Sequence, residues 1–161
     1  MPQQLQITPD SIVSLREVTH KNLSDVIELS DTLSEAHRHM VASNAVSIAQ
    51  AHFSPHAWFQ AIYADEVPVG FLMLHIGADD HWIDYGGFFL WRMMIAAPYQ
   101  RMGFGKRALE LVIDHIARQG VDELRTSCGE GEGSPEGFYR SLGFESDGDM
   151  YDDEVGLTLK F

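Results

Sequence analysis

The sequence predicts a single α/β domain (α+β in some classifications), and three observations support this prediction. The 161 residues are 45% hydrophobic, which suits one core, and no polar linker or repeat separates a second domain. Segments with strand-like alternation follow segments with helix-like spacing along the chain. The clearest helix, residues 106–120, comes soon after an almost wholly apolar strand, residues 87–96. We expect residues 1–10 to be a flexible leader and residues 11–161 to form the domain.

The first half of the chain contains the patterns of a strand, two helices and a hairpin. Apolar and polar residues alternate over residues 11–18, which is typical of a strand. Apolar residues at intervals of three and four predict a helix within 22–33 and one further helix within 34–53. Residues 57–76 are largely apolar and are interrupted at Asp65–Pro68, so we expect two strands joined by a turn.

The second half of the chain contains the patterns of three strands and two helices. The apolar strand within 87–96 is expected to be covered on both faces. The helix of residues 106–120 ends naturally at Gly120, and a strand over 121–128 follows. A glycine-rich stretch then leads into a short helix, with Ser134 as N-cap, Pro135 in the first turn and Gly143 just beyond the end. Residues 154–161 are expected to add the last strand.

Charge is abundant and unevenly distributed. The net charge of −13 makes nucleic acid an improbable partner, because phosphate contacts require clustered Lys and Arg, whereas a cationic or neutral substrate is readily accommodated. Residues 92–107 hold four basic residues and no acid, while residues 145–154 hold six acids and no base. A basic region and an acidic region would suit two ligands of opposite charge. The acidic run is equally compatible with a chance cluster of surface charges.

Targeting signals and cysteine usage favour the cytoplasm. No stretch approaches the ~18 uninterrupted apolar residues of a membrane span, and the amino terminus has neither a basic start nor an apolar run for export. We therefore expect a cytoplasmic protein with no membrane contact. The single cysteine, Cys128, cannot form an internal disulfide and suits a reducing compartment.

The stretch "APYQRMGFGKRAL", residues 97–109, is basic and punctuated by glycine; we call its residues 100–106 the glycine turn. A turn that leaves a strand and opens a long helix exposes unbonded backbone N–H groups at the positive end of the helix dipole, which together attract an anion such as phosphate. The turn lacks the Lys followed by Ser or Thr of a Walker loop and the third glycine of a dinucleotide loop. Taken alone, it is also compatible with a tight turn that binds nothing.

Two motifs together resemble those of the Gcn5-related N-acetyltransferases, the GNAT superfamily. In "MMIAAPYQRMGFGKRALELVI", Gln100, Gly103 and Gly105 match the family pattern of Gln or Arg, two residues, Gly, any residue, then Gly or Ala. The second motif is "GFYRSLGF", residues 137–144, at the usual separation. The resemblance spans residues 12–161. It implies a mixed, largely antiparallel central sheet that is flanked by helices and splayed at the acetyl-CoA site.

Within the superfamily the chain looks most like bacterial spermine/spermidine and diamine acetyltransferases. The similar segments are "VASNAVSIAQA", "LWR..I" and "YQ..G.GK.AL". This resemblance implies acetyl transfer to a primary amine of a small cation such as spermidine or spermine, in a homodimer. Glu132 and Pro135 stand where many members have Asn and Ala, which leaves open part of the usual contact to the pantetheine arm.

The resemblance also implies a role for individual residues. The diphosphate of acetyl-CoA would lie on the amides of the glycine turn, with Arg101 and Lys106 adding charge. The pantetheine would pair with the strand backbone of residues 93–95, where the N–H of Met94 would polarise the thioester carbonyl. Tyr139 matches the family's general acid, although it would also fit a core position beside Phe138. The implied cofactor-binding residues are Met93, Met94, Ile95, Gln100, Arg101, Met102, Gly103, Phe104, Gly105 and Lys106.

The base that frees the acceptor amine is not evident in the sequence. An amine with a lysine-like pKa of about 10.4 is uncharged in only about one molecule in 2500 at pH 7. Relatives in the polyamine branch often place an acid on the strand before the glycine turn, where this chain has Trp91. Asp84, Tyr85 and Glu130, acting through water, are the candidates. Trp91 would either flank the amine or belong to the core.

Alternative functions remain. In one alternative, the protein acetylates another amine: a protein N-terminus, a lysine, an amino acid or an antibiotic amine. In the other, it binds CoA without turnover. The histidines at positions 37, 39, 52 and 56 suggest a metal, but no carboxylate or thiol completes a set nearby and Pro55 breaks a helix between the last two. We therefore expect no metal.

Overall fold

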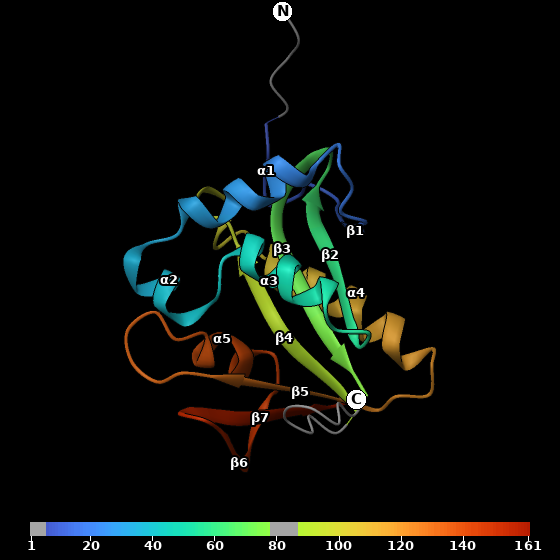
Figure 1. Cartoon of the computed structure of the whole chain (residues 1–161), viewed down its shortest axis with the longest axis vertical. Coiled ribbons are helices and arrows are strands. Elements are labelled where there is room, and N and C mark those ends of the chain that lie inside the picture. The colour runs from blue at the N-terminus through green and yellow to red at the C-terminus, as the bar shows by residue number, and fades with distance from the viewer. Residues whose placement is uncertain (1–5, 78–86) are drawn as a thin grey trace, which may run out of the picture.

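One seven-stranded sheet with helices on both faces forms the protein in the computed structural model, which describes residues 6–77 and 87–161 (Figure 1). The strands are β1 (Val13–Arg16), β2 (Ala57–Ala64), β3 (Val67–Ile76), β4 (Phe88–Ile95), β5 (Glu123–Cys128), β6 (Glu145–Tyr151) and β7 (Glu154–Lys160). The α-helices are α1 (Leu23–Glu28), α2 (Glu35–Met40), α3 (Asn44–His52), α4 (Phe104–Ala117) and α5 (Glu136–Ser141), with short 3-10 turns at Leu29–Thr32 and Ala97–Tyr99.

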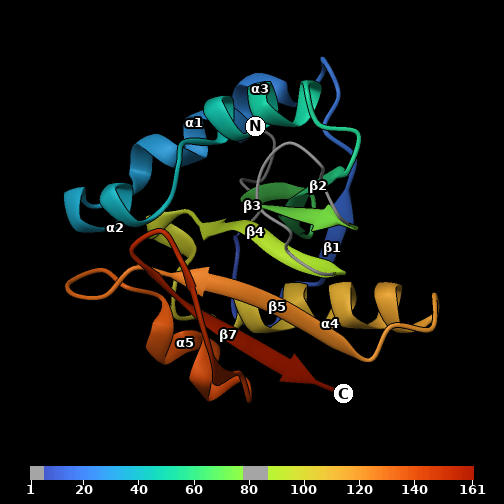
Figure 2. The ribbon, with the colours of Figure 1, turned by 60° about the horizontal axis from the view of Figure 1, so that its bottom comes forward.

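The sheet is mixed and mostly antiparallel. Its order is β1-β2-β3-β4-β5-β7-β6, and every adjacent pair is antiparallel except β4 and β5. Helices α1 to α3 cover one face, and α4 and α5 cover the other (Figure 2). The fold class expected from the sequence is therefore confirmed.

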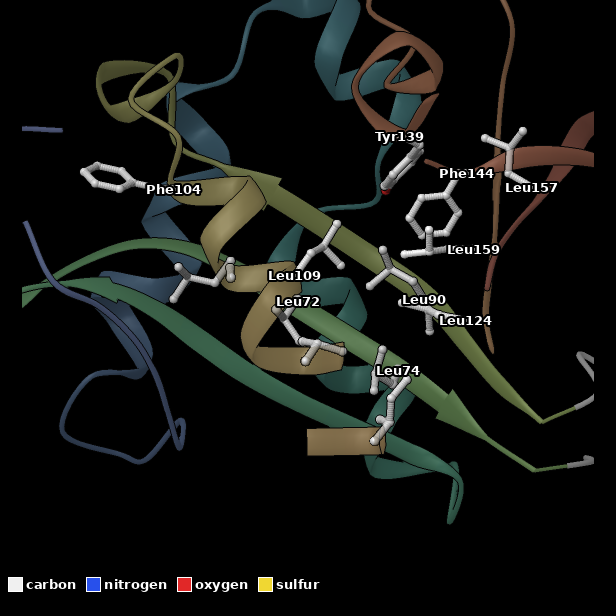
Figure 3. Packing of buried hydrophobic residues seen from close by; sticks show 14 of the residues in the cluster. Leu72, Leu74, Leu90, Phe104, Leu109, Leu124, Tyr139, Phe144, Leu157 and Leu159 are labelled. Atoms are coloured by element: carbon white, nitrogen blue, oxygen red, sulfur yellow. The ribbon is translucent and has the colours of Figure 1, made fainter. Parts of the chain in front are cut away.

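Each face of the sheet has its own core. Towards α4 and α5, Leu72 and Leu74 of β3 pack with Leu109 of α4 and with Phe144 (Figure 3). Towards α1 and α3, Phe71 and Met73 of the same strand pack with Val26. Adjacent residues of β3 are buried on opposite faces, as expected of a central strand covered on both sides.

Strands β4 and β5 separate soon after they meet. Their parallel pairing covers only Phe89 with Arg125 and Leu90 with Thr126. At that point the Thr126 hydroxyl donates a hydrogen bond to the Leu90 carbonyl at 2.9 Å, so a side chain satisfies the last carbonyl of the ladder. We call this point the fork. Beyond it, within the described part of the chain, residues 91–95 of β4 pair with no strand on the edge that faces β5.

Several element boundaries differ from the expectation. The single helix expected within 34–53 is two helices, because Val41 is extended and Ser43 begins a new helix by accepting a hydrogen bond from the N–H of Val46. Strand β6 was not expected, since its acidic sequence lacks an apolar face and its residues are mostly exposed. The turn between β2 and β3 is only Asp65 and Glu66, so Pro68 lies within a strand.

The short helix α5 and the start of the described chain are both held by specific contacts. Gly143, with φ of 100°, follows the end of α5 as expected. The N-cap of α5 is Pro135 rather than Ser134, although the Ser134 hydroxyl accepts a hydrogen bond from the N–H of Glu136. Of the expected leader, residues 1–5 lie outside the described part. Pro9 accepts a hydrogen bond from Arg107 of α4, and Ile7 packs against the core. Among the described residues, no helix has the length and apolar character needed to cross a membrane.

Replacing Gly70 of β3 by alanine is expected to destabilise the protein by about 1–3 kcal/mol. Gly70 pairs with Ile95, and a Cβ at this position would lie 2.5 Å from the Met94 carbonyl oxygen and 2.8 Å from Ile95 Cδ1. The backbone of β4 would have to move away. Chemical denaturation of the variant measures the loss.

Gly137→Ala in α5 is the matched control for that experiment. A Cβ at Gly137 meets nothing within 4 Å, and alanine in a helix is favoured over glycine by roughly 0.5–1 kcal/mol. This control variant should be slightly stabilised. Equal stability changes in the two variants would contradict the close approach of β3 to β4.

Candidate functional site

A cavity of about 840 Å³ extends from the glycine turn into the gap beyond the fork. Its walls come from β4 and the glycine turn, from α2 and residues 41–42, from the end of β5, and from α5 with the loop before it. Helix α2 closes one side of the cavity by packing on the loop between β5 and α5, where a Cβ on Gly133 would lie 2.8 Å from the Ala36 carbonyl oxygen. The cavity therefore lies where the two halves of the sheet diverge.

The start of α4 is built to receive an anion. Gly103 precedes the helix with φ of 82°, a conformation that favours glycine, and no side chain caps the helix. The first turn contains no acid, and the amides at the start of a helix lack intrahelical acceptors. Lys106 is exposed beside them and lines the cavity. The donor set of amides plus a cation suits a phosphate group.

Two polar side chains of this region form hydrogen bonds to backbone carbonyls instead. The Gln100 side chain donates a hydrogen bond to the Ile95 carbonyl at 2.8 Å, which ties the glycine turn to the end of β4. Arg107 donates hydrogen bonds to the carbonyls of Pro9, Ser11 and Met102. Of the basic residues of this stretch, Arg101 and Lys106 are exposed, and both line the cavity.

The ladder of β3 and β4 decides which peptide groups of β4 face the cavity. The N–H of Ala96 donates to the Val69 carbonyl of β3, and the Met94 carbonyl lies against Gly70 of β3. Because peptide groups alternate along a strand, Met94 directs its N–H and C=O toward β3, whereas Met93 and Ile95 direct theirs toward the gap. The expected oxyanion contact from the Met94 N–H is therefore at odds with the strand geometry.

Tyr139 is both a core residue and a cavity residue. Only 5% of it is exposed, and its ring contacts that of Phe144 at a centroid distance of 5.3 Å (Figure 3). The ring of Phe138 lies at a centroid distance of 5.5 Å. It lines the cavity, and its hydroxyl interacts with Thr126 at the fork. Burial raises the pKa of Tyr139 well above its ordinary value. The hydroxyl therefore keeps its proton and remains a hydrogen-bond donor.

The cavity brings together most of the cofactor-binding residues expected from the sequence. Its lining includes Met93, Met94, Ile95, Gln100, Arg101, Gly103, Phe104, Gly105 and Lys106. Met102 is not among the lining residues, because its side chain packs against the core. Gly105 makes room for α5, since a Cβ there would lie 3.1 Å from Phe138 Cζ. Pro135 also lines the cavity, whereas Glu132 is exposed outside it.

The expected acceptor-side residues are more scattered. Trp91 lines the cavity, yet its ring also contacts His75 edge-on at 5.8 Å, and it packs against the α1–α3 core. Glu130 is exposed and is not part of the lining. Asp84 and Tyr85 lie outside the described residues. Of these four residues, Trp91 is therefore the one that the structure places in the cavity wall.

Sequence reasoning missed one carboxylate, Glu154 at the start of β7. It is half-buried and is the acidic side chain among the described lining residues. The Ser127 hydroxyl of β5 donates a hydrogen bond to Glu154 Oε1 at 2.9 Å. In the sequence, Glu154 is one of six acids in a run, and only the pairing of β7 with β5 distinguishes it from the others.

The remaining reactive side chains do not form a second centre within the described part of the chain. In residues 6–77 and 87–161, no group of three His, Cys, Asp or Glu side chains lies close enough to hold a metal. His52 ends α3, while His56 Nδ1 donates a hydrogen bond to the Ile76 carbonyl oxygen, so the two do not share a helix face. Burial raises the pKa of Cys128, which keeps it a thiol.

Solved structures share this fold at low sequence identity. The PaiA N-acetyltransferase of Thermoplasma acidophilum, in complex with coenzyme A, superposes with a TM-score of 0.67 and 17% identity, covering 93% of this chain and 99% of that one. Arabidopsis thaliana Naa50, bound to the bisubstrate analogue CoA-Ac-MVNAL, gives 0.63 and 21%, covering 92% and 99%. A Salmonella typhimurium acetyltransferase that modifies the N-terminal serine of ribosomal protein L7/L12 gives 0.72 and 12%, covering 96% and 98%.

The sequence comparison agrees with the fold and the site. No curated protein sequence matches the chain. The model of the acetyltransferase (GNAT) family matches residues 25–144, which is most of the chain and includes both the glycine turn and Tyr139. An uncapped helix start, a divided sheet and a family match thus agree: the chain belongs to the GNAT family and is an acetyl-CoA-dependent N-acetyltransferase.

Proposed function

We propose that the protein acetylates a primary amine of a small polyamine or diamine, such as spermidine or spermine, by direct attack on acetyl-CoA in a ternary complex. The observation that carries this proposal is the course of the cavity, from the uncapped start of α4 past the fork to Glu154. Its residues fit an anion at one end and a cation at the other. In this reading the glycine turn binds the diphosphate, and the thioester lies beside Met93 and Ile95.

Charge supports a cationic acceptor. The lining near the cofactor end includes Arg101 and Lys106, whereas the opposite side holds Glu154. Asp152 and Asp153, both exposed, form the turn next to Glu154, so a polyamine approaching from that side meets the negative charge of this turn. A negative field of this kind attracts cations and raises their association rate.

The catalytic roles follow from where the groups lie. Tyr139 would protonate the departing thiolate, because its hydroxyl lies at the fork and carries a proton at neutral pH. The raised pKa makes Tyr139 a weaker acid, so the hydroxyl must lie within hydrogen-bond distance of the sulfur when the proton is transferred. Strand alternation makes the N–H of Met93 or Ile95, rather than Met94, the donor to the oxyanion. Arg101 and Lys106 would bind the diphosphate with the amides of the glycine turn.

A panel of acceptors tests the choice of substrate. With acetyl-CoA in excess and thiol release as readout, kcat/KM for spermidine should exceed that for uncharged amines by about tenfold or more, and should fall as salt is raised, because screening weakens attraction to exposed acids. A preference for uncharged acceptors would reject the polyamine assignment.

A protein N-terminus is the second candidate. Of the structures that share the fold, the Salmonella typhimurium enzyme modifies the N-terminal serine of a ribosomal protein, and Naa50 is bound to the bisubstrate analogue CoA-Ac-MVNAL. An α-amino group has a pKa of about 7.7–8.0 and therefore needs less help from a base than an alkylamine does. Peptides beginning with Ser or Met belong in the same panel, and higher kcat/KM for them than for spermidine would favour this candidate.

A further inference from the structure

We propose that Glu154 is the general base that takes the proton from the acceptor's ammonium group. This inference deepens the proposed function and requires only that the acceptor be an alkylamine. It answers the question that the sequence leaves open, because Trp91 occupies the strand position where a base was sought. The carboxylate comes from the opposite wall of the cavity, at the start of β7.

A hydrogen bond and the pairing of β5 with β7 hold Glu154 in place. Ser127 donates a hydrogen bond to Oε1 at 2.9 Å, and no described residue donates one to Oε2. The Ser127 backbone pairs with Gly156 and that of Cys128 pairs with Val155, so the ladder of β5 and β7 fixes where β7 begins. Glu130, the carboxylate expected from the sequence, is exposed and outside the lining.

Glu154 and Tyr139 approach the fork from opposite faces of β5. Thr126 and Ser127 are neighbours in the strand and point to opposite faces. Thr126 interacts with Tyr139 on the α5 face, while Ser127 holds Glu154 on the other. Burial is the main cause of the raised pKa of Tyr139, and the charges of Cys128 and then Glu154 raise it further.

This arrangement separates entry of the amine from departure of the thiolate. An amine arriving on the α2 side meets Glu154, and a thiolate leaving on the α5 side meets Tyr139. The charged or titratable groups that also line this cavity are Cys128 of β5, His37, Arg38 and His39 of α2, Arg92 of β4, Tyr99, Arg101 of the glycine turn and Lys106 of α4. Arg38 donates to the carbonyls of Leu33 and Asp31, and Arg92 donates to Gln50.

The proton balance is complete with these two residues. Glu154 takes one proton from R–NH₃⁺, and the freed amine forms a C–N bond to the acetyl carbon. The C–S bond then breaks, and the thiolate receives a proton from Tyr139. The second proton of the nitrogen is released as the amide forms and replaces the one that Tyr139 gave up. Glu154 returns its proton to water, so the products are the acetamide, CoA-SH and one H⁺.

Glu154→Gln tests the proposal with little change of shape, because the amide oxygen can still accept from Ser127. With spermidine at pH 7.5, kcat should fall by about 10²-fold or more, the usual range for a general base. The deficit relative to wild type should shrink as the pH rises toward 10, because the uncharged fraction of the amine grows about tenfold per pH unit. CoA binding, measured by calorimetry, should be unchanged.

Two further variants complete the experiment. Asp153→Asn removes the same charge from the neighbouring turn, where the side chain is exposed and outside the lining, and should change kcat less than about twofold. Ser127→Ala keeps the carboxylate but loses its hydrogen bond, and should lower kcat by a smaller factor than Glu154→Gln. Should Glu154→Gln fail to bind CoA, the other two variants still test the proposal. A larger loss of kcat in Ser127→Ala than in Asp153→Asn would support the base assignment, and the reverse order would contradict it.

The outcomes are distinct. A higher KM with unchanged kcat at every pH would overturn the base assignment and make Glu154 an anchor for the cation. Equal losses in Glu154→Gln and Asp153→Asn would reduce its role to the general field of the hairpin. If the wild type prefers another alkylamine, the polyamine proposal fails while the Glu154 test proceeds on that amine. A wild-type protein that is inactive on every amine would contradict both the polyamine proposal and the base assignment.

Discussion

Tyr139→Phe is expected to lower kcat by about 10²-fold or more, the usual range for loss of a general acid, while CoA binding stays nearly unchanged. The phenylalanine ring fills the same space between Phe138 and Phe144, so the fold and the cavity wall are retained. What is lost is the hydroxyl at the fork, beside Thr126. Thiol release with the preferred amine, together with calorimetric titration of CoA, measures the two effects separately.

Tyr63→Phe is the matched control for Tyr139→Phe. Tyr63 is also buried, but its hydroxyl accepts a hydrogen bond from Asn22 on the other face of the sheet and does not line the cavity. Losing that bond should cost about 1 kcal/mol of stability and leave kcat unchanged. Full activity in Tyr139→Phe would make Tyr139 a core residue only and would shift the acid role to another donor.

The raised pKa of Tyr139 also predicts how stability depends on pH. The folded-state pKa lies above the unfolded value of about 10, so the folded chain holds this proton more tightly. The stabilisation is fully present below pH 10 and is lost as the pH rises through the folded-state pKa. Tyr139→Phe should therefore flatten the alkaline fall in the free energy of unfolding, which denaturation between pH 8 and 11 would reveal.

Lys106→Glu is expected to weaken CoA binding by about 10- to 100-fold while leaving the fold as stable or slightly more stable. Lys106 is the third residue of α4, where a carboxylate would complement the uncapped amides and add about 0.3–1 kcal/mol. The same carboxylate would compete with and repel the diphosphate, and the favourable ammonium contact would be lost. Binding and stability should therefore change in opposite directions.

Lys160→Glu controls for the change in net charge that Lys106→Glu introduces. Lys160 is exposed at the end of β7 and does not line the cavity, so this variant should bind CoA like the wild type. Lys106→Gln should fall between wild type and Lys106→Glu, and added salt should narrow the spread. Unchanged CoA affinity in Lys106→Glu would place the diphosphate elsewhere and would remove the basis for the proposed orientation.

Local patterns account for what the sequence predicted well. The strand before the glycine turn, helix α4 and the short helix with Tyr139 each follow from spacing, caps and glycine positions within a few neighbouring residues. The family resemblance rests on the same segments. Strand β6 was missed because its exposed acidic residues show no apolar alternation, and the break between α2 and α3 was missed because apolar spacing continues across it.

The sequence by itself therefore determined the fold class, the glycine turn at the start of α4 and the place of Tyr139 in the short helix, since each depends on short-range spacing and backbone chemistry. Only the tertiary structure decided which groups face the cavity. The β3–β4 ladder turned the Met94 amide away, hydrogen bonds engaged the Gln100 and Arg107 side chains, and the β5–β7 register selected Glu154 from a run of acids. Such choices depend on the pairing of segments distant in sequence, which local spacing does not encode.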